Sequence, residues 1–382
     1  MQISETLSHI RLRPGFYLRT VIDGNKPNGG IYTMLREVLN NSINEFEAGY
    51  GDIIRFTASK NTVTVQDRGS GIPQKFLVDV STEFQKRNIW VTAKQKVGVA
   101  HFGLKPVNAL SDNYYIESSR DGKTYFAHFS RGALLEKGEK DAAGNGCGTI
   151  VSFTPDATIF GDYEIKPQFI ESIIRNCSYF ETGLTFDFTY NNESEPELSY
   201  HKTIRNKNGL VDFIEYKLDG DEPEYPPVHI KGEDFEVAFT HTRRFYRRQI
   251  FNQGLYSAVN GHFTIDGGEH LDAFTKSIAQ AMSKRYGRRI KTMDIFSGMI
   301  CIVSINIEEP NFGNECKTML SSKYMSEVNK DVTIKSYVND RFSPMLLEYL
   351  SNNNDVAERI RRIVVGDRQE IEISSQKRDE NK

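Results

Sequence analysis

Neighbouring strand patterns in this chain are separated by short turns, and this feature most constrains its fold. Residues 52–59 and 62–67 are two β-rich runs joined at Lys60 and Asn61. Residues 114–129 hold a second such pair around Asp121 and Gly122, and an Asp-Gly pair between β-rich runs is a strong hairpin signal. Hairpins join antiparallel strands, whereas parallel strands need crossovers of about a dozen residues or more. The pattern therefore predicts an α+β chain and not a doubly wound sheet.

A polar, acidic segment at residues 191–207 divides the chain, and the strand and helix patterns restart after it. At about 150 residues per domain, 382 residues provide for two or three domains, and we predict two, residues 1–204 and 205–382. In the first, helical patterns occupy residues 31–46 and 167–177, and a further short helix is expected to end near residue 110. Strand patterns also occupy residues 149–153 and 184–190, and residues 138–148 are expected to be a loop. In the second, strand patterns occupy residues 228–230, 235–241, 255–259 and 299–307, and helical patterns occupy residues 268–286 and much of residues 332–364.

Composition excludes several classes of protein. Lys and Arg number 48 and Asp and Glu 51, for a net charge of −3, so the chain is not a globally basic nucleic-acid coat protein. Its 38% of hydrophobic residues argues against a disordered chain. Four dispersed cysteines without a C-x-x-C pair indicate neither a disulfide framework nor a zinc site. With no long apolar span and no signal-peptide pattern, we expect a cytoplasmic protein without a membrane partner.

One helical pattern carries a polar row beside its apolar stripe. The stripe recurs at intervals of three and four over residues 31–46. Glu37, Asn41 and Glu45 are spaced by four, so they share one helical face. Taken alone, such a row is most often a solvated helix face. Its neighbours in the sequence favour a functional interpretation.

Three glycine-containing segments follow this row. Gly69-Ser70-Gly71-Ile72-Pro73 comes after a strand pattern that ends at Asp67. A second run, from Gly98 to Gly103, leads into a short helical pattern, and Gly148-Thr149 precedes a strand pattern. In this order the segments resemble the ATP site of the superfamily of gyrase, Hsp90, histidine kinases and MutL.

Further segments narrow the resemblance to the B subunit of bacterial type II topoisomerases, with topoisomerase IV somewhat closer than gyrase. They are Arg13-Pro14-Gly15-Phe16-Tyr17, residues 108–111 and 120–123, Val259-Asn260-Gly261, residues 267–271 and residues 317–320. The resemblance covers residues from about 9 to 322. It implies a Bergerat-type GHKL ATPase domain, an α/β sandwich, followed by a transducer domain with a ribosomal S5 domain 2-like fold.

The resemblance implies ATP and Mg²⁺ as cofactors and assigns roles to single residues. Glu37 would be the general base for the water that attacks the γ-phosphate, and Asn41 would bind Mg²⁺ through its side-chain oxygen. Asp67 would accept a hydrogen bond from the adenine amino group, with help from the Thr149 hydroxyl. Lys317, a second catalytic residue, would reach the γ-phosphate from the second domain.

The glycine segments supply most of the other implied contacts with ATP. Gly98 and Gly103 would let backbone N–H groups approach the phosphates at the start of a helix. The implied ATP-binding residues are Asn41, Glu45, Asp67, Gly71, Ile72, Pro73, Gly98, Val99, His101, Gly103 and Thr149.

Three positions depart from the family pattern. His101 stands where the family has a glycine, and it either donates to a phosphate oxygen or has no chemical role. Ser70 replaces an arginine that pairs with the carboxylate at Glu45, and Arg68 is a candidate substitute for it. Glu315 replaces a glutamine and would repel the γ-phosphate. Because base, metal ligand and adenine acceptor are intact, the sequence predicts ATP binding and leaves the rate of turnover open.

Positive charge is concentrated in the second domain, at residues 243–248, 284–291 and 359–362. Local positive charge on a near-neutral chain suits a surface that contacts DNA phosphates. The alternative is that these residues only solubilise helix ends and loops. The residues expected to face DNA are Arg243, Arg244, Arg247, Arg248, Arg288 and Arg289.

The implied function is an ATP-binding and ATP-hydrolysing module of a type II DNA topoisomerase, which dimerises on ATP and gates DNA strand passage. Expected partners are double-stranded DNA, a second copy of the chain, an A-type subunit and a TOPRIM domain, in cis or on another chain, since we expect none here. One alternative is a nucleotide-gated DNA clamp or adaptor with weak or no hydrolysis. Another, a MutL-like or chaperone-like ATPase, is disfavoured by residues 267–271 and 317–318.

Overall fold

The computed structural model describes residues 3–18, 24–26, 29–83, 103–141, 146–242, 254–313 and 317–365. The chain forms two compact units that meet in sequence between Lys207 and Asn208, against an expected boundary after residue 204. Each unit has its own sheet and its own hydrophobic core. Within the described ranges, no helix combines the length and the apolar character needed to cross a membrane.

Unit 1 begins with short helices and contains both helical and strand segments. Its helices are α1 (Glu5–Leu12), α2 (Pro14–Leu18), α3 (Gly30–Glu47), η1 (Gln74–Phe76), α4 (Asp79–Thr82), α5 (Leu104–Ala109), α6 (Ala157–Phe160), α7 (Pro167–Ser178) and η2 (Pro196–Leu198). Its strands are β1 (Ile53–Ala58), β2 (Val63–Gln66), β3 (Ser111–Arg120), β4 (Lys123–Ser130), β5 (Ala133–Asp141), β6 (Gly148–Pro155), β7 (Thr185–Tyr190) and β8 (Tyr200–Ile204).

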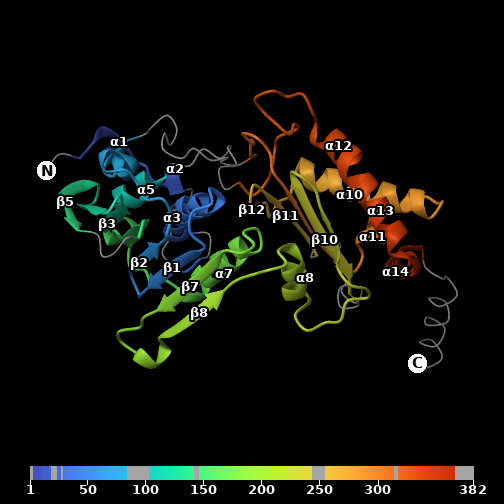
Figure 1. The fold of residues 1–382 in the computed structure, drawn as a ribbon, viewed down its shortest axis with the longest axis horizontal. Helices are drawn as coiled ribbons and strands as arrows, with labels where there is room; N and C mark the ends of the chain where they lie inside the picture. Colours follow the sequence, from blue (N-terminus) through green and yellow to red (C-terminus); the bar gives the residue numbers. More distant parts are fainter. Residues whose placement is uncertain are drawn as a thin grey trace. The chain divides into compact units, whose positions relative to one another are not determined.

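In unit 1, helices α3, α5 and α7 pack against an eight-stranded sheet (Figure 1). The strand order is β5-β4-β3-β6-β2-β1-β7-β8, in which β1 and β7 are parallel and the other neighbours antiparallel. Ile54, Phe56 and Ala58 alternate as the buried residues of β1, as expected for a strand with one face on the core. The apolar stripe of α3 is buried in the same core. The prediction of an α+β chain is confirmed.

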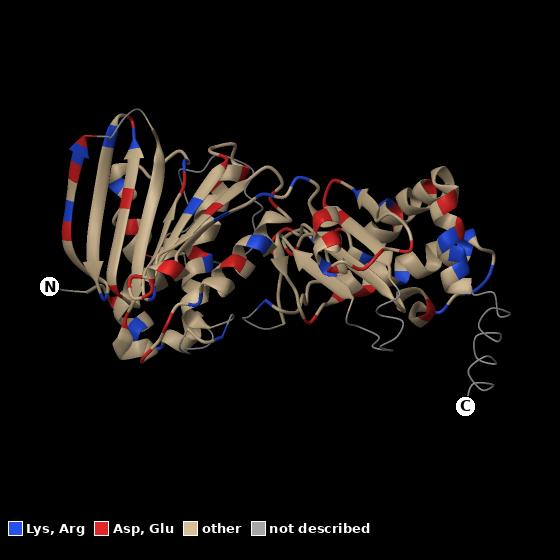
Figure 2. Cartoon of the chain, turned by 90° about the horizontal axis from the view of Figure 1, so that it is seen from below, with Lys and Arg blue, Asp and Glu red and all other residues tan. Residues whose placement is uncertain are grey.

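Both edge strands of this sheet include residues that the sequence analysis did not predict as strand. β5 continues to Asp141, so the expectation of a loop is wrong for residues 138–141. β8 lies inside the polar segment at residues 191–207. Charged, exposed side chains are common on edge strands because they prevent pairing with another chain, and they hide the apolar alternation. Figure 2 shows this pattern on β5, where positive and negative residues follow one another.

Unit 2 contains a smaller sheet and several helices. Its strands are β9 (Val228–Lys231), β10 (Phe235–His241), β11 (Leu255–Val259), β12 (His262–Phe263) and β13 (Met299–Ile305). Its helical segments are α8 (Leu210–Leu218), α10 (Glu269–Arg285), α11 (Thr292–Phe296), α12 (Ile334–Tyr337), η3 (Val338–Phe342), α13 (Ser343–Asn352) and α14 (Asn354–Val365).

The sheet of unit 2 has five strands in the order β12-β11-β13-β10-β9. β11 and β13 are parallel, and α10 lies between them in sequence, as a parallel connection requires. Phe274, Ile278 and Met282 of α10 are fully buried, and the final helices add Phe342, among others, to the same core. Helix α8, which the sequence analysis did not anticipate, contacts β10 and β13.

Two histidines in unit 2 are buried in neutral form. His241 is fully buried, and burial lowers its pKa to about 4. Its Nε2 donates to the Ile295 carbonyl oxygen, so its Nδ1 accepts from the Tyr225 hydroxyl. His270 is also fully buried, and burial lowers its pKa to about 3. Its Nε2 lies 3.0 Å from the Thr264 hydroxyl oxygen.

We predict that unit 2 loses stability as the pH falls below about 6.5, the pKa of histidine in an unfolded chain. Because the folded pKa values of His241 and His270 are lower, this stability is complete above the unfolded pKa and is lost as the pH falls towards about 4 and about 3. Each pKa unit corresponds to roughly 1.4 kcal/mol. Urea unfolding of the chain at pH 7.5, 6 and 5 measures the loss. His270→Gln should reduce the pH dependence, because it removes one of the two buried neutral histidines. Equal pH dependence in the wild type and His270→Gln would contradict the prediction.

Candidate nucleotide-binding site

Asp67 follows β2 directly, and only 7% of it is exposed. The Ser42 hydroxyl donates to its Oδ2 at 2.8 Å, and the backbone N–H groups of Gly69 and Thr149 donate to its Oδ1 at 2.9 Å and 3.0 Å. A carboxylate offers about four acceptor positions. The donors described fill three of these and leave a position on Oδ2, which suits an amino group of a ligand.

The environment of Asp67 acts on its pKa in two directions. Burial raises the pKa of this carboxyl most strongly, and the nearby Glu45 charge adds to the rise. The hydrogen bonds from Gly69, Ser42 and Thr149 lower the pKa but do not cancel the effect of burial. These donors are arranged for an ionised carboxylate, because only that form is purely an acceptor.

Gly148 allows the start of β6 to approach Asp67. A Cβ at this glycine would lie 2.3 Å from the Asp67 carbonyl oxygen, and its φ of 149° is one that residues with side chains rarely adopt. The next residue, Thr149, accepts from the Asp67 N–H at 3.0 Å and donates its own N–H to the Asp67 carboxylate. The structure thus brings together the two residues that the resemblance assigns to adenine.

Glu45 accepts a hydrogen bond from the backbone N–H of Ser70 at 2.6 Å. The sequence suggested that Arg68 might replace the missing arginine partner, but the structure gives the carboxylate a backbone donor. Gly69 makes this possible, because a Cβ there would lie 2.7 Å from Glu45 Oε2. The Ser70 backbone therefore contacts the Glu45 carboxylate directly.

The loop after Asp67 is fixed to β3. Ser118 Oγ accepts from the Ile72 N–H at 2.6 Å, and Arg120 Nη1 donates to the Gly71 carbonyl oxygen at 2.9 Å. Gly71 has a φ of 75°, and a Cβ there would lie 2.5 Å from the Ser119 carbonyl oxygen. Pro73 ends this loop immediately before η1.

Glu37 and Asn41 lie one turn apart on α3. Glu37 Oε2 accepts from the backbone N–H of Gly103 at 3.0 Å, immediately before α5. Asn41 Nδ2 donates to the Glu37 carbonyl oxygen at 2.7 Å, so its Oδ1 is directed away from the helix backbone. The Lys105 amine is close enough for Glu37 to affect it: burial lowers the pKa of Lys105, and the Glu37 charge opposes this shift.

Other predicted site residues are distributed between the described and undescribed parts of the chain. Those outside the described residues are Gly98, Val99, His101, Arg243, Arg244, Arg247, Arg248 and Glu315. Lys317 is described, in unit 2, with a positive φ of 53°. Its segment is held by backbone bonds within that unit, among them Asp266 N–H to the Thr318 carbonyl oxygen at 2.7 Å. The predicted contact between Lys317 and the γ-phosphate stays a prediction.

Ser42 and Ser118 are two site residues that sequence reasoning missed. Ser42 lies four residues after Val38, on the apolar stripe of α3, and is 5% exposed. A serine on a buried stripe needs a hydrogen-bond partner, and this signal was available in the sequence. Ser118 is fully buried and pairs with Thr149 across β3 and β6, which only the sheet register shows.

Basic residues gather on the helices near the end of unit 2, as Figure 2 shows. Arg288 and Arg289 are exposed and follow α10, while α14 carries the exposed Arg359, Arg361 and Arg362. Arg285 Nη2 donates to Asn354 Oδ1 at 3.0 Å, which joins the end of α10 to the start of α14. Two clusters that are far apart in sequence therefore lie on neighbouring helices.

Comparison with known families defines the class of unit 1. A family model described as histidine kinase-, DNA gyrase B- and HSP90-like ATPase matches residues 28–158. These residues include α3 and the segment around Asp67, so unit 1 has the GHKL ATPase fold expected from its motifs. A second model, DNA gyrase B, matches residues 209–380.

The similar proteins specify the family. The B subunit of DNA topoisomerase 4 from Borreliella burgdorferi is 32% identical over 320 residues, covering 83% of this chain and 50% of the relative. The B subunit of DNA gyrase from Thermotoga maritima is 28% identical over 363 residues, covering 86% of this chain and 54% of the relative. The chain belongs to the family of bacterial type II topoisomerase B subunits, as its motifs predicted.

A solved structure matches almost the whole chain. The 43K ATPase domain of Thermus thermophilus gyrase B, solved with an aminocoumarin, has a TM-score of 0.71 and 25% identity, and 98% of each chain is covered. The chain spans about half the length of the curated relatives it matches.

Proposed function

We propose that this chain is the ATP-dependent gate of a type II DNA topoisomerase. It binds and hydrolyses ATP in unit 1, dimerises in response to ATP, and passes the nucleotide state to unit 2. Double-stranded DNA, a second copy of the chain, an A-type subunit and a TOPRIM domain are the proposed partners, in the cytoplasm. The names of the relatives and the order of the motifs support this proposal.

The observation that carries the proposal is the environment of Asp67. Three protein donors leave one acceptor position on its buried carboxylate. The adenine amino group is a donor, whereas guanine presents a carbonyl oxygen at the same ring position. A site with a fixed acceptor therefore selects ATP over GTP, because an unpaired buried acceptor costs free energy.

Glu37 is the proposed general base. A carboxylate can take the proton of the attacking water, and the Gly103 N–H holds one of its oxygens in place. The proposed phosphate contacts are Gly98, Val99, His101 and Gly103. The proposed adenine side of the site is lined by Gly71, Ile72 and Pro73. Glu45 holds the loop that contains these three residues by accepting the Ser70 N–H. Lys317 is the proposed ligand of the γ-phosphate from unit 2.

Asn41 fits a Mg²⁺ ligand because its amide nitrogen is used by the helix and its oxygen is a hard ligand. Mg²⁺ in nucleotide sites takes few protein ligands and binds mainly to water and phosphate oxygens. The described residues contain no cluster of three or more His, Cys, Asp or Glu that could hold a metal by itself. When bound, the ion would offset the negative charge on the phosphates.

Asn41→Ala should raise the Mg²⁺ concentration for half-maximal ATP turnover by about tenfold or more, the scale on which changes around metal sites act. Asn44→Ala, on the same helix and outside the proposed site, is the matched control and should keep the wild-type Mg²⁺ dependence. Titrating Mg²⁺ at fixed ATP after treatment with a chelator measures both variants. An unchanged titration for Asn41→Ala would remove Asn41 from the metal site.

The proposed DNA surface includes the exposed arginines of α14 and of the segment after α10. It also includes Arg243, Arg244, Arg247 and Arg248, which lie outside the described residues. Binding through phosphate contacts weakens steeply with salt and is independent of sequence. Arg288→Glu and Arg289→Glu together should therefore weaken DNA binding and reduce its dependence on salt.

The gate itself is tested by retention of circular DNA. The chain is mixed with closed circular duplex and a non-hydrolysable ATP analogue, then washed with high salt. A gate that closes around DNA retains circles and releases them when they are cut, since a topological link survives salt that breaks phosphate contacts. Equal retention of circular and linear DNA would contradict the gate.

A further inference from the structure

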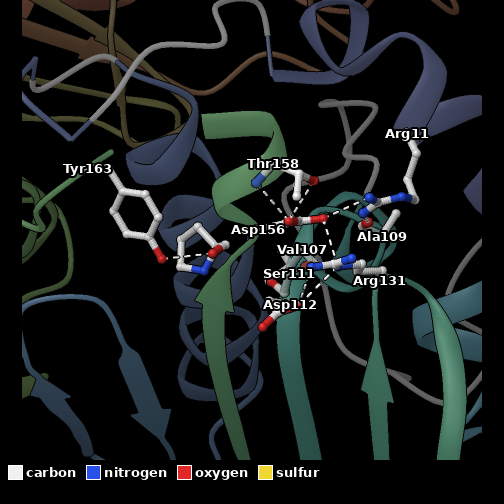
Figure 3. Close-up of polar contacts among 10 residues, drawn as sticks. Arg11, Val107, Ala109, Ser111, Asp112, Arg131, Asp156, Thr158 and Tyr163 are labelled. Carbon is white, nitrogen blue, oxygen red and sulfur yellow. Dashed lines mark hydrogen bonds and ion pairs between the residues drawn. The ribbon is translucent and has the colours of Figure 1, made fainter. Parts of the chain in front are cut away.

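Asp156 is the centre of a polar cluster at the start of α6 (Figure 3). Arg11 Nη2 lies 2.7 Å and Arg131 Nε 3.3 Å from its Oδ2. The backbone N–H and the hydroxyl of Thr158 donate to its Oδ1 at 2.9 Å and 2.8 Å. The cluster joins α1, the turn after β4 and the end of β6, which are far apart in sequence.

The Asp156 side chain is completely buried and charged. Burial alone would raise the pKa of its carboxyl, but the hydrogen bonds from Arg11 and Thr158 and the charge of Arg11 outweigh burial and hold the pKa below its usual range. A buried charge keeps its partners in place, because losing one partner leaves that charge without compensation.

Residues of the cluster donate hydrogen bonds to three successive carbonyl oxygens at the junction between α5 and β3. Arg11 Nη1 donates to Ala109 at 2.7 Å, the Asp156 N–H donates to Leu110 at 2.9 Å, and the Arg131 N–H donates to Ser111 at 2.8 Å. Figure 3 shows the Arg11 guanidinium between Ala109 and Asp156, in contact with both. Of the three donors, Arg11 is the side chain that holds the last residue of α5.

The other end of α5 lies at the proposed base. Gly103 precedes the helix, and its N–H donates to Glu37 Oε2 at 3.0 Å. At about 1.5 Å per residue, the six residues of α5 span roughly 9 Å. Leu104, Val107 and Ala109 are buried in the core of unit 1, so the short helix is closely packed and its two ends are rigidly connected.

We propose that Arg11 is a positioning residue for Glu37. By binding the Ala109 carbonyl oxygen and Asp156 together, it fixes α5 along its axis and keeps the Gly103 N–H on the Glu37 carboxylate. Arginine suits this role because its planar, rigid group donates to two acceptors at once. The inference rests on the function proposed for Glu37.

The kinetic test compares Arg11→Gln with Arg131→Gln in the full 382-residue chain. Both variants remove a cationic partner of the same buried carboxylate, but only the first frees the Ala109 carbonyl oxygen. Arg11→Gln should lower kcat for ATP by about 10- to 100-fold, the cost of a misplaced catalytic group. The Kd for ADP should change less than about twofold, because the Asp67 contacts are untouched. Arg131→Gln should keep kcat and Kd near the wild type, even if its Tm falls.

A second measurement does not depend on hydrolysis. In chains labelled with ¹⁵N-glycine, the Gly103 resonance is assigned by its shift in Glu37→Gln. Its amide hydrogen should exchange faster by at least about tenfold in Arg11→Gln, because a lost hydrogen bond exposes the N–H. It should exchange at the wild-type rate in Arg131→Gln.

The two measurements separate the positioning role from the proposed function. Unchanged Gly103 exchange in Arg11→Gln overturns the positioning role, as do equal losses of kcat in the Arg11 and Arg131 variants. If the wild-type chain hydrolyses no ATP while Gly103 exchange responds to Arg11, the positioning contact holds and the hydrolytic function fails.

Discussion

Glu37→Gln should lower kcat for ATP hydrolysis by about 10²- to 10⁴-fold, the range that a general base contributes, with little change in ATP affinity. Glutamine has the shape of glutamate, and its side-chain oxygen can still accept the Gly103 N–H that Glu37 accepts at 3.0 Å. It cannot take a proton from water at neutral pH. The variant therefore removes the base and preserves the structure around it.

Steady-state hydrolysis gives kcat, and calorimetric titration with a non-hydrolysable ATP analogue gives the affinity. Glu47→Gln, at the last residue of the same helix and outside the site, is the matched control and should hydrolyse ATP like the wild type. If Glu37→Gln turns over ATP at a comparable rate, another group is the base.

Asp67→Asn should weaken binding of adenine nucleotides by roughly 100-fold, as expected when a charged hydrogen bond is lost and a buried donor is left unpaired. The asparagine oxygen can accept the Gly69 and Thr149 N–H groups that donate to Asp67 Oδ1, so the fold persists. Its amide nitrogen then occupies the place of Oδ2, where it presents a donor to the amino group of adenine. The preference for ATP over GTP falls with the affinity.

Competition between ATP and GTP analogues for a fluorescent nucleotide measures both effects. Ser42→Ala is the comparison variant: it removes the 2.8 Å hydrogen bond to Oδ2 but leaves both carboxylate oxygens as acceptors, so it should cost less affinity. Unchanged affinity and base preference in Asp67→Asn would move the adenine contact to another residue.

Much of the fold could be predicted from local patterns. The stripe on α3, the hairpins around Lys60 and Asp121, and the helix α10 are each specified by residues close in sequence. The edge strands β5 and β8 could not be predicted in this way. Most of their residues are exposed, so their strand character comes from pairing with β4 and β7, which is a long-range property.

The candidate site likewise has parts that local sequence could predict and parts that depend on long-range contacts. Helical spacing predicts only that Glu37 and Asn41 share one face of α3, and their roles, like those of Asp67 and Thr149, come from the resemblance. The donors that complete the site come from register and packing: Ser118 meets the Ile72 N–H only because β3 pairs with β6. The link from Arg11 to Glu37 runs through α5 and Asp156, residues that no local pattern joins.

Hydrolysis of Mg²⁺-ATP by the 382-residue chain, with and without duplex DNA and beside Glu37→Gln, tests the central claim most directly. The account predicts saturable turnover that DNA changes and that Glu37→Gln abolishes. Saturable ATP binding with turnover no higher than that of Glu37→Gln, with or without DNA, would contradict it and indicate a nucleotide-gated clamp.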